Sequence, residues 1–140
     1  AHLSDIVVTN NEEKLIVYFN VEGCFTAEML RAIESGISTT FTFYVNLYQE
    51  KDFWLDSLIS EVEVRHTVKY DQIKKRYELR LTEKEDEMLI LHDLEEVRQV
   101  MSEVVALEVA SLDQMERGNQ YQIRMKAELE KLKEQVQNVE

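Results

Sequence analysis

Apolar and polar residues alternate along much of the chain, with the period of two that is typical of strands buried on one face. The clearest run is residues 39–48, in which every second residue is large and apolar: Phe41, Phe43, Val45 and Leu47. The opposite face of the same run carries Thr40, Thr42, Tyr44, Asn46 and Tyr48. The pattern predicts a long strand with one side in the core.

Further strands are predicted on both sides of this run, at residues 5–9, 14–22, 61–70, 77–81, 88–91, 104–112 and 121–129. The first two flank Asn10-Asn11-Glu12-Glu13, which contains the residues that a hairpin turn needs. In the segment 61–70, one face is polar and the other carries Val62, Val64, His66, Val68 and Tyr70. A meander is the simplest topology for these strands.

Two short helices are predicted between the strands. Thr26 can accept a hydrogen bond from a free N–H group of a helix over residues 27–34, and Gly36 supplies a left-handed stop. Asp93, followed three residues later by Glu96, has the form of a capping box and predicts a helix through about residue 101. The chain contains no proline and three glycines, so it lacks a flexible or proline-rich linker.

These patterns predict an α+β fold, predominantly antiparallel β: a sandwich or open barrel-like meander with two short helices. We expect one β-rich domain over residues 1–132 and a tail over 133–140, helical or disordered. The apolar stripe of Leu129, Leu132, Val136 and Val139 also fits a helix with coiled-coil spacing, which predicts homo-oligomers through the C-terminal segment. There is no run of 18 apolar residues, so we expect no membrane span.

Charge is distributed unevenly. The formal net charge is −12, from 16 basic and 28 acidic residues, and such a field repels nucleic acid. The segment 65–80 is basic, with six basic residues against two acidic ones, whereas residues 83–116 carry eleven acids and two bases. We expect a docking surface for a protein at Lys74, Lys75 and Arg76. The alternative is that these charges cover the outer face of the strands and pair across it.

Aromatic side chains mark a second candidate surface. Tyr44 and Tyr48 lie on the less apolar face of their strand, and Phe53 and Trp54 follow in the next connection. Exposed aromatic residues often anchor protein binding. Burial under the helices or a second sheet is the alternative.

Catalytic and metal-binding patterns are missing from the sequence. Cys24 is the only cysteine, and its pairing with His66 is the one nucleophile–base combination to consider; a small buried thiol explains it better. His2, His66 and His92 lack metal-ligand spacing. The acidic run 83–87 lacks the calcium-loop pattern and is interpreted as a solvated turn. We therefore expect neither enzyme activity nor a cofactor.

The order of several motifs resembles a bacterial family of exported proteins, the domain-of-unknown-function family 4390. The resemblance rests on Val21-Glu22-Gly23 after the first hairpin, Ser35-Gly36-Ile37 leading to Phe41, Trp54 with Asp56, and Val68-Lys69-Tyr70-Asp71 with Tyr77. It covers about residues 5–129 and implies a periplasmic or envelope location, with no activity or cofactor to transfer. The family pattern continues with aromatic-rich strand sequence beyond about residue 132. Residues 133–140 of this chain depart from that pattern.

Together, these observations predict a non-catalytic exported envelope protein that acts as a protein-binding or accessory module. The alternative is a carrier of a small apolar ligand or lipid in a cleft between the sheet and the helices. The start at Ala1 fits either a trimmed chain or the end left by signal cleavage.

Overall fold

The computed structural model describes residues 2–51 and 55–131, and side chains through residue 129. The strands are β1 (His2–Asn10), β2 (Lys14–Glu22), β3 (Thr39–Gln49), β4 (Ser57–Asp71), β5 (Arg76–Leu81), β6 (Met88–Leu91), β7 (Glu103–Ser111) and β8 (Tyr121–Lys131). The helices are α1 (Ala27–Glu34) and α2 (Leu94–Met101), and two 3₁₀ turns are η1 (Thr82–Lys84) and η2 (Leu112–Gln114).

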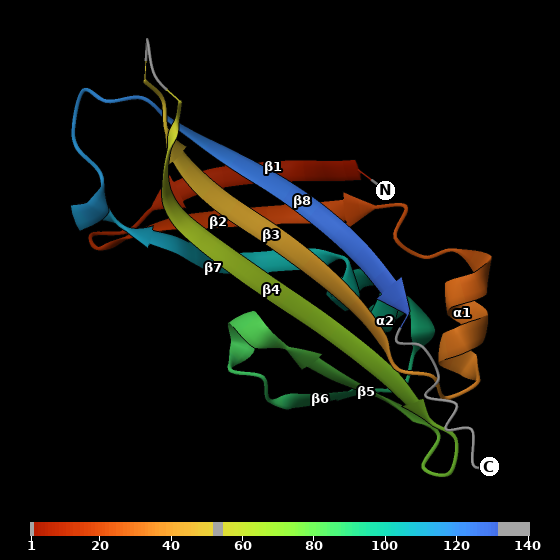
Figure 1. The fold of residues 1–140 in the computed structure, drawn as a ribbon. Helices are drawn as coiled ribbons and strands as arrows, with labels where there is room; N and C mark the ends of the chain where they lie inside the picture. Colours follow the sequence, from red (N-terminus) through yellow and green to blue (C-terminus); the bar gives the residue numbers. More distant parts are fainter. Residues whose placement is uncertain (1, 52–54, 132–140) are drawn as a thin grey trace, which may run out of the picture.

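Two antiparallel sheets face each other. One has three strands in the order β1-β2-β7, and the other has five in the order β6-β5-β4-β3-β8. Both helices lie toward one end of the two sheets (Figure 1). The expected α+β class with mainly antiparallel sheets is confirmed, and the arrangement is a sandwich.

The predicted meander is correct only for β3 to β6. After β6 the chain passes through α2, and β7 then pairs with β2 in the other sheet. β8 returns to the five-stranded sheet on the free side of β3. Alternation along a strand shows which side chains are buried, but it does not show which strand lies alongside.

Local side-chain bonds shape the two hairpins. In the β1–β2 turn, Asn11 Oδ1 accepts from the N–H groups of Glu13 and Lys14, at 2.8 and 2.7 Å. In the β4–β5 turn, Asp71 Oδ1 accepts from the N–H groups of Ile73 and Lys74, at 2.9 and 3.0 Å. These turns fix the register of the strands that follow them.

The helix ends follow the sequence with one difference. Thr26 caps α1 by accepting from the Met29 N–H group, and the chain leaves this helix at Gly36 with φ +84°. At α2, Asp93 accepts from the N–H group of Glu95, so the predicted box with Glu96 is not the bond that forms. A reciprocal box closes η2 instead, where the Gln114 side chain accepts from the Ser111 N–H group.

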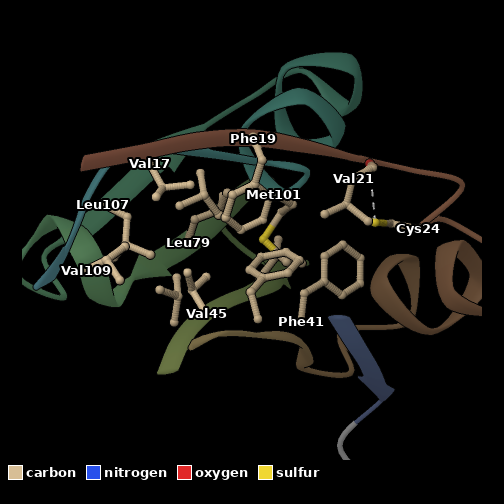
Figure 2. Close-up of a cluster of buried hydrophobic side chains, with 14 of the residues drawn as sticks. Val17, Phe19, Val21, Cys24, Phe41, Val45, Leu79, Met101, Leu107 and Val109 are labelled. Carbon is tan, nitrogen blue, oxygen red and sulfur yellow. Dashed lines mark hydrogen bonds between the residues drawn. The ribbon is translucent and has the colours of Figure 1, made fainter. Parts of the chain in front are cut away.

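The core fills the space between the sheets. Side chains of β2 and β7 face those of β3 and β5, with Met101 at the end of α2 among them (Figure 2). The Phe43 ring meets Phe19 of the opposite sheet edge-on, with ring centroids 5.8 Å apart, and His66 of the neighbouring strand at 5.1 Å. Phe43 therefore joins the two layers at the centre of the core.

Replacing Phe43 by alanine should lower the free energy of unfolding by about 3–5 kcal/mol, because the ring is fully buried and its loss leaves a cavity. Urea denaturation followed by far-UV circular dichroism would measure the loss. Ile73→Ala is the control, since Ile73 is 93% exposed and its change should stay within about 0.5 kcal/mol. Equal effects of the two substitutions would contradict this description of the core.

Candidate functional site

The outer face of the five-stranded sheet brings Tyr44 and Tyr48 together with side chains of both neighbouring strands. Tyr44 lies between Glu63 of β4 and Lys126 of β8 in the register. Two residues along β3, Asn46 lies beside Arg124, and Tyr48 follows on the same face. Tyr44 and Tyr48 are half-buried. The sequence had left open whether they are exposed or buried, and their exposure lies between these two alternatives.

Arg124 lies at one end of this face and contacts side chains around it. Its guanidinium group lies 4.0 Å from the centre of the Tyr48 ring, a cation–π contact. Its Nη2 donates to Asp56 Oδ2 at 2.6 Å, and its Nε donates to Gln122 Oε1 at 2.7 Å. Nothing in the sequence pattern singles out Arg124, because the contact depends on β8 pairing with β3.

Tyr44 contacts a second cluster of polar side chains, formed by Glu128 and Lys126. Its hydroxyl donates to Glu128 Oε2 at 3.2 Å, and Lys126 Nζ lies 3.2 Å from Glu128 Oε1. Burial and then the negative charge of Glu128 raise the pKa of Tyr44, so the hydroxyl remains a donor. A shallow depression of about 280 Å³ lies beside these groups and is bordered by Asn46 and Arg124 as well.

The basic segment 65–80 forms a hairpin of β4 and β5, here called the basic hairpin, and its tip lies at the other end of the same sheet. Lys74 and Lys75 are exposed at its tip, and neither forms an ion pair within the described part of the chain. Arg76 is different, because its Nη2 donates to Glu78 Oε2 at 3.0 Å. The N–H group of Lys74, more than its charge, lowers the pKa of Asp71 and keeps this carboxylate ionised.

The outer face is the less acidic side of an acidic chain. Strand alternation places eleven described charged side chains on it: Arg65, Lys69, Arg76, Arg80, Arg124, Lys126, Glu61, Glu63, Asp71, Glu78 and Glu128. With Lys74 and Lys75 at the tip and Asp56 bonded to Arg124, eight basic side chains stand against six acidic ones. Several of them pair, as the alternative interpretation expected, but the sum remains positive in a chain of net charge −12.

Trp54 and Phe53 lie outside the described residues.

A buried histidine–glutamate pair is the feature that the sequence patterns did not reveal. His66 Nε2 lies 2.6 Å from Glu83 Oε1, and the two side chains are 0% and 4% exposed. The interpretation of the run 83–87 as a solvated turn is therefore wrong for Glu83. His66 pairs with Leu81 across β4 and β5, and Glu83 follows two residues later in η1. That register was the signal that could have revealed the pair.

The hydrogen bonds of His66 fix the number of protons on this pair. Its Nδ1 lies 3.0 Å from the Met101 carbonyl oxygen, which can only accept, so Nδ1 must carry a hydrogen. One further proton has to lie between Nε2 and the Glu83 carboxyl group, because two acceptors would repel each other at 2.6 Å. The pair is thus neutral overall, and it joins β4, η1 and the end of α2.

Cys24 and His66 do not form the pairing that the sequence raised. Cys24 Sγ donates to the Val21 carbonyl oxygen at 3.5 Å (Figure 2). Both ring nitrogens of His66 are bonded elsewhere. Burial raises the pKa of the Cys24 thiol, which the side-chain bond to Ser102 lowers only in part. Cys24 is a buried core residue.

Two further features concern residues 2–51 and 55–131, which the structure describes. Within them, no three or more His, Cys, Asp and Glu residues cluster in a way that could hold a metal ion. No helix formed by these residues is both long and apolar enough to span a membrane.

The fold and this face define a class: an antiparallel α+β sandwich that presents tyrosine, arginine and lysine on one broad sheet surface. The family described as domain of unknown function DUF4390 matches residues 1–133, and the chain belongs to this family. No curated protein and no solved structure matches the chain.

Replacing His66 by leucine should lower the free energy of unfolding by about 3–5 kcal/mol, because Glu83 then stays buried without its partner. The double substitution His66→Leu with Glu83→Leu should recover part of this loss, since no charge remains buried. A double-mutant cycle by chemical denaturation measures the coupling. Additive effects of the two single substitutions would contradict a direct interaction.

Proposed function

We propose that this protein is a non-catalytic, exported accessory module that binds another protein through the outer face of its five-stranded sheet. The contact surface centres on Tyr44 and Tyr48, and the basic hairpin with Lys74, Lys75 and Arg76 extends it at one end. Export to the periplasm or cell envelope rests on the family resemblance described above.

The observation that carries this proposal is the arrangement around Tyr48. Tyrosine and arginine are enriched among residues that dominate binding energy, and here the two stack on an open face. The bonds of Arg124 to Asp56 and Gln122, and of Tyr44 to Glu128, hold these side chains in place before any partner arrives. Less conformational entropy is then lost on binding.

The positive sum on this face favours a partner with an acidic contact surface. Opposite potentials speed diffusional encounter and suppress binding to wrong partners. Because Arg76 is paired with Glu78, Lys74 and Lys75 are the tip cations that are free to contact the partner.

The packing between the sheets supports a binding module over an apolar-ligand carrier. The side chains there fill the space themselves: Val17, Phe41, Val45, Leu47, Val68 and Leu79 are each 0% exposed. A carrier needs an apolar cavity of several hundred Å³. The depression beside Tyr44 and Arg124 lies instead on the outer face. Another, of about 480 Å³, lies at the loop between β7 and β8, beside Leu112, Met115 and Tyr121, and not between the sheet and the helices.

The double substitution Tyr44→Ala with Tyr48→Ala should weaken partner capture at least about thirtyfold, because two anchoring rings are lost. Capture would be measured with the immobilised protein in envelope extract, followed by titration of the purified partner. Charge reversal by Lys74→Glu with Lys75→Glu should mainly slow association and reduce its salt dependence.

Tyr18→Ala is the matched control, since Tyr18 is a half-buried tyrosine on β2 of the other sheet. It should leave capture unchanged. Capture that survives both the double tyrosine substitution and the charge reversal would exclude the proposed face.

Export makes a separate prediction about the natural gene product. Osmotic shock or fractionation of the source bacterium should release it with a periplasmic or envelope marker. Detection by antibody only in the cytoplasmic fraction would overturn the proposed location and leave the binding surface to be judged by the capture experiment.

A further inference from the structure

The four sheet edges differ in how well they resist pairing with another strand. An edge strand exposes unpaired N–H and C=O groups, and proteins protect such edges with charges, bulges or very short strands. β6 has four residues, and β8 carries alternating charges at Arg124, Lys126 and Glu128. β7 is bulged near Ala106, at φ +55°, and its Val109 carbonyl accepts from Ser60 of β4.

β1 carries little of this protection beyond its bulge. Within the described residues it pairs with β2 alone, and it contains no lysine, arginine or proline. After the bulge at Asp5, which has φ +50°, pairing with β2 is regular from Val7 to Asn10. Ile6, Val7 and Val8 are 47%, 52% and 50% exposed, so three adjacent branched apolar side chains lie half in solvent.

The direction of the open hydrogen-bonding groups follows from the turn. The Asn11 N–H group donates to the Lys14 carbonyl oxygen, so this pair is hydrogen-bonded. In an antiparallel pair the bonded positions alternate, which turns the backbone groups of Val7 and Thr9 toward β2. The N–H and C=O groups of Val8 and Asn10 therefore point to the open side.

The charge of the three-stranded sheet determines which kind of strand can pair with β1. The three-stranded sheet and its first turn carry one lysine, Lys14, against six acids: Asp5, Glu12, Glu13, Glu22, Glu103 and Glu108. Pairing of β1 with β1 of a second copy would bring two such acidic sheets together, in chains of net charge −12 each. An incoming strand with basic side chains meets opposite charges instead.

We propose that β1 is a second binding site, which takes an extended, basic, β-branched segment of a partner protein as an added antiparallel or parallel strand. The backbone groups of Val8 and Asn10 bond the segment, and Ile6 and Val8 pack against its apolar side chains. The acids around the sheet attract its basic side chains. This site lies on the sheet opposite to the Tyr44–Tyr48 face and is independent of it.

A fluorescein-labelled nine-residue peptide of alternating lysine and valine tests this site by fluorescence anisotropy. It should bind saturably, and a peptide of alternating glutamate and valine should not. Val8→Pro should weaken binding about tenfold or more, because it removes an N–H group from the open edge and leaves the β1–β2 bonds intact. Val8→Ala is the matched control, which retains the N–H group and should lose less than about threefold.

Amide hydrogen exchange on the unsubstituted protein covers the case in which Val8→Pro fails to fold. The peptide should slow exchange at Val8 and Asn10, and the Tyr44→Ala with Tyr48→Ala protein should bind it equally well. Failure of the peptide to bind, equal binding of the glutamate peptide or equal binding by Val8→Pro would overturn the proposal. Protection from exchange that is confined to β3 and β8 would also overturn the proposal. A dimer detected by light scattering, with the Val8 amide already protected before peptide is added, would do the same.

Discussion

The structure depends on the burial of one row of side chains along β3. Phe41, Phe43, Val45 and Leu47 are each at most 1% exposed, and they pack against β2 across the space between the sheets. β3 also pairs with β4 on one side and with β8 on the other, so it joins β8 to the rest of the larger sheet. Since side chains alternate along a strand, burying this row forces Tyr44 and Tyr48 to the outer face.

The burial of the apolar row on β3 is a non-directional constraint, and the His66–Glu83 pair adds a directional one. Apolar burial tolerates small changes in how elements pack, whereas a buried neutral pair requires its donors and acceptors to meet. Through Glu83 and the Met101 carbonyl, His66 connects β4 to η1 and to the end of α2. The point where the chain leaves the larger sheet for the smaller one is thereby fixed.

The two sheets offer different surfaces as a consequence. The larger sheet buries one face and presents ordered tyrosine and arginine side chains on the other, with basic residues toward the hairpin tip. The smaller sheet leaves an open edge at β1, where Ile6, Val7 and Val8 lie half in solvent in acidic surroundings. A face binds mainly through side chains and an edge through backbone groups, so the two suit different partners.

The sequence by itself determined the strands, the two helices and the sides that face the core, because these follow from local periodicity and capping. Thr26 and the row from Phe41 to Leu47 are examples that the structure confirms. Tertiary structure alone decided that β7 joins β2 and that β8 joins β3. Strand pairing depends on contacts between distant segments, which alternation does not encode.

The same division applies to the candidate surfaces. Residue types singled out Tyr44, Tyr48, Lys74, Lys75 and Arg76. The fold placed the two tyrosines and Arg76 on strands of one sheet, and the two lysines in the turn between two of its strands. The roles of Arg124 and Glu83 emerged only with that fold. Arg124 meets Tyr48 because β8 pairs with β3, and Glu83 is buried because the β4–β5 register carries it to His66. A charged residue is expected to lie in solvent unless a partner compensates for its burial, and that partner was far away in the sequence.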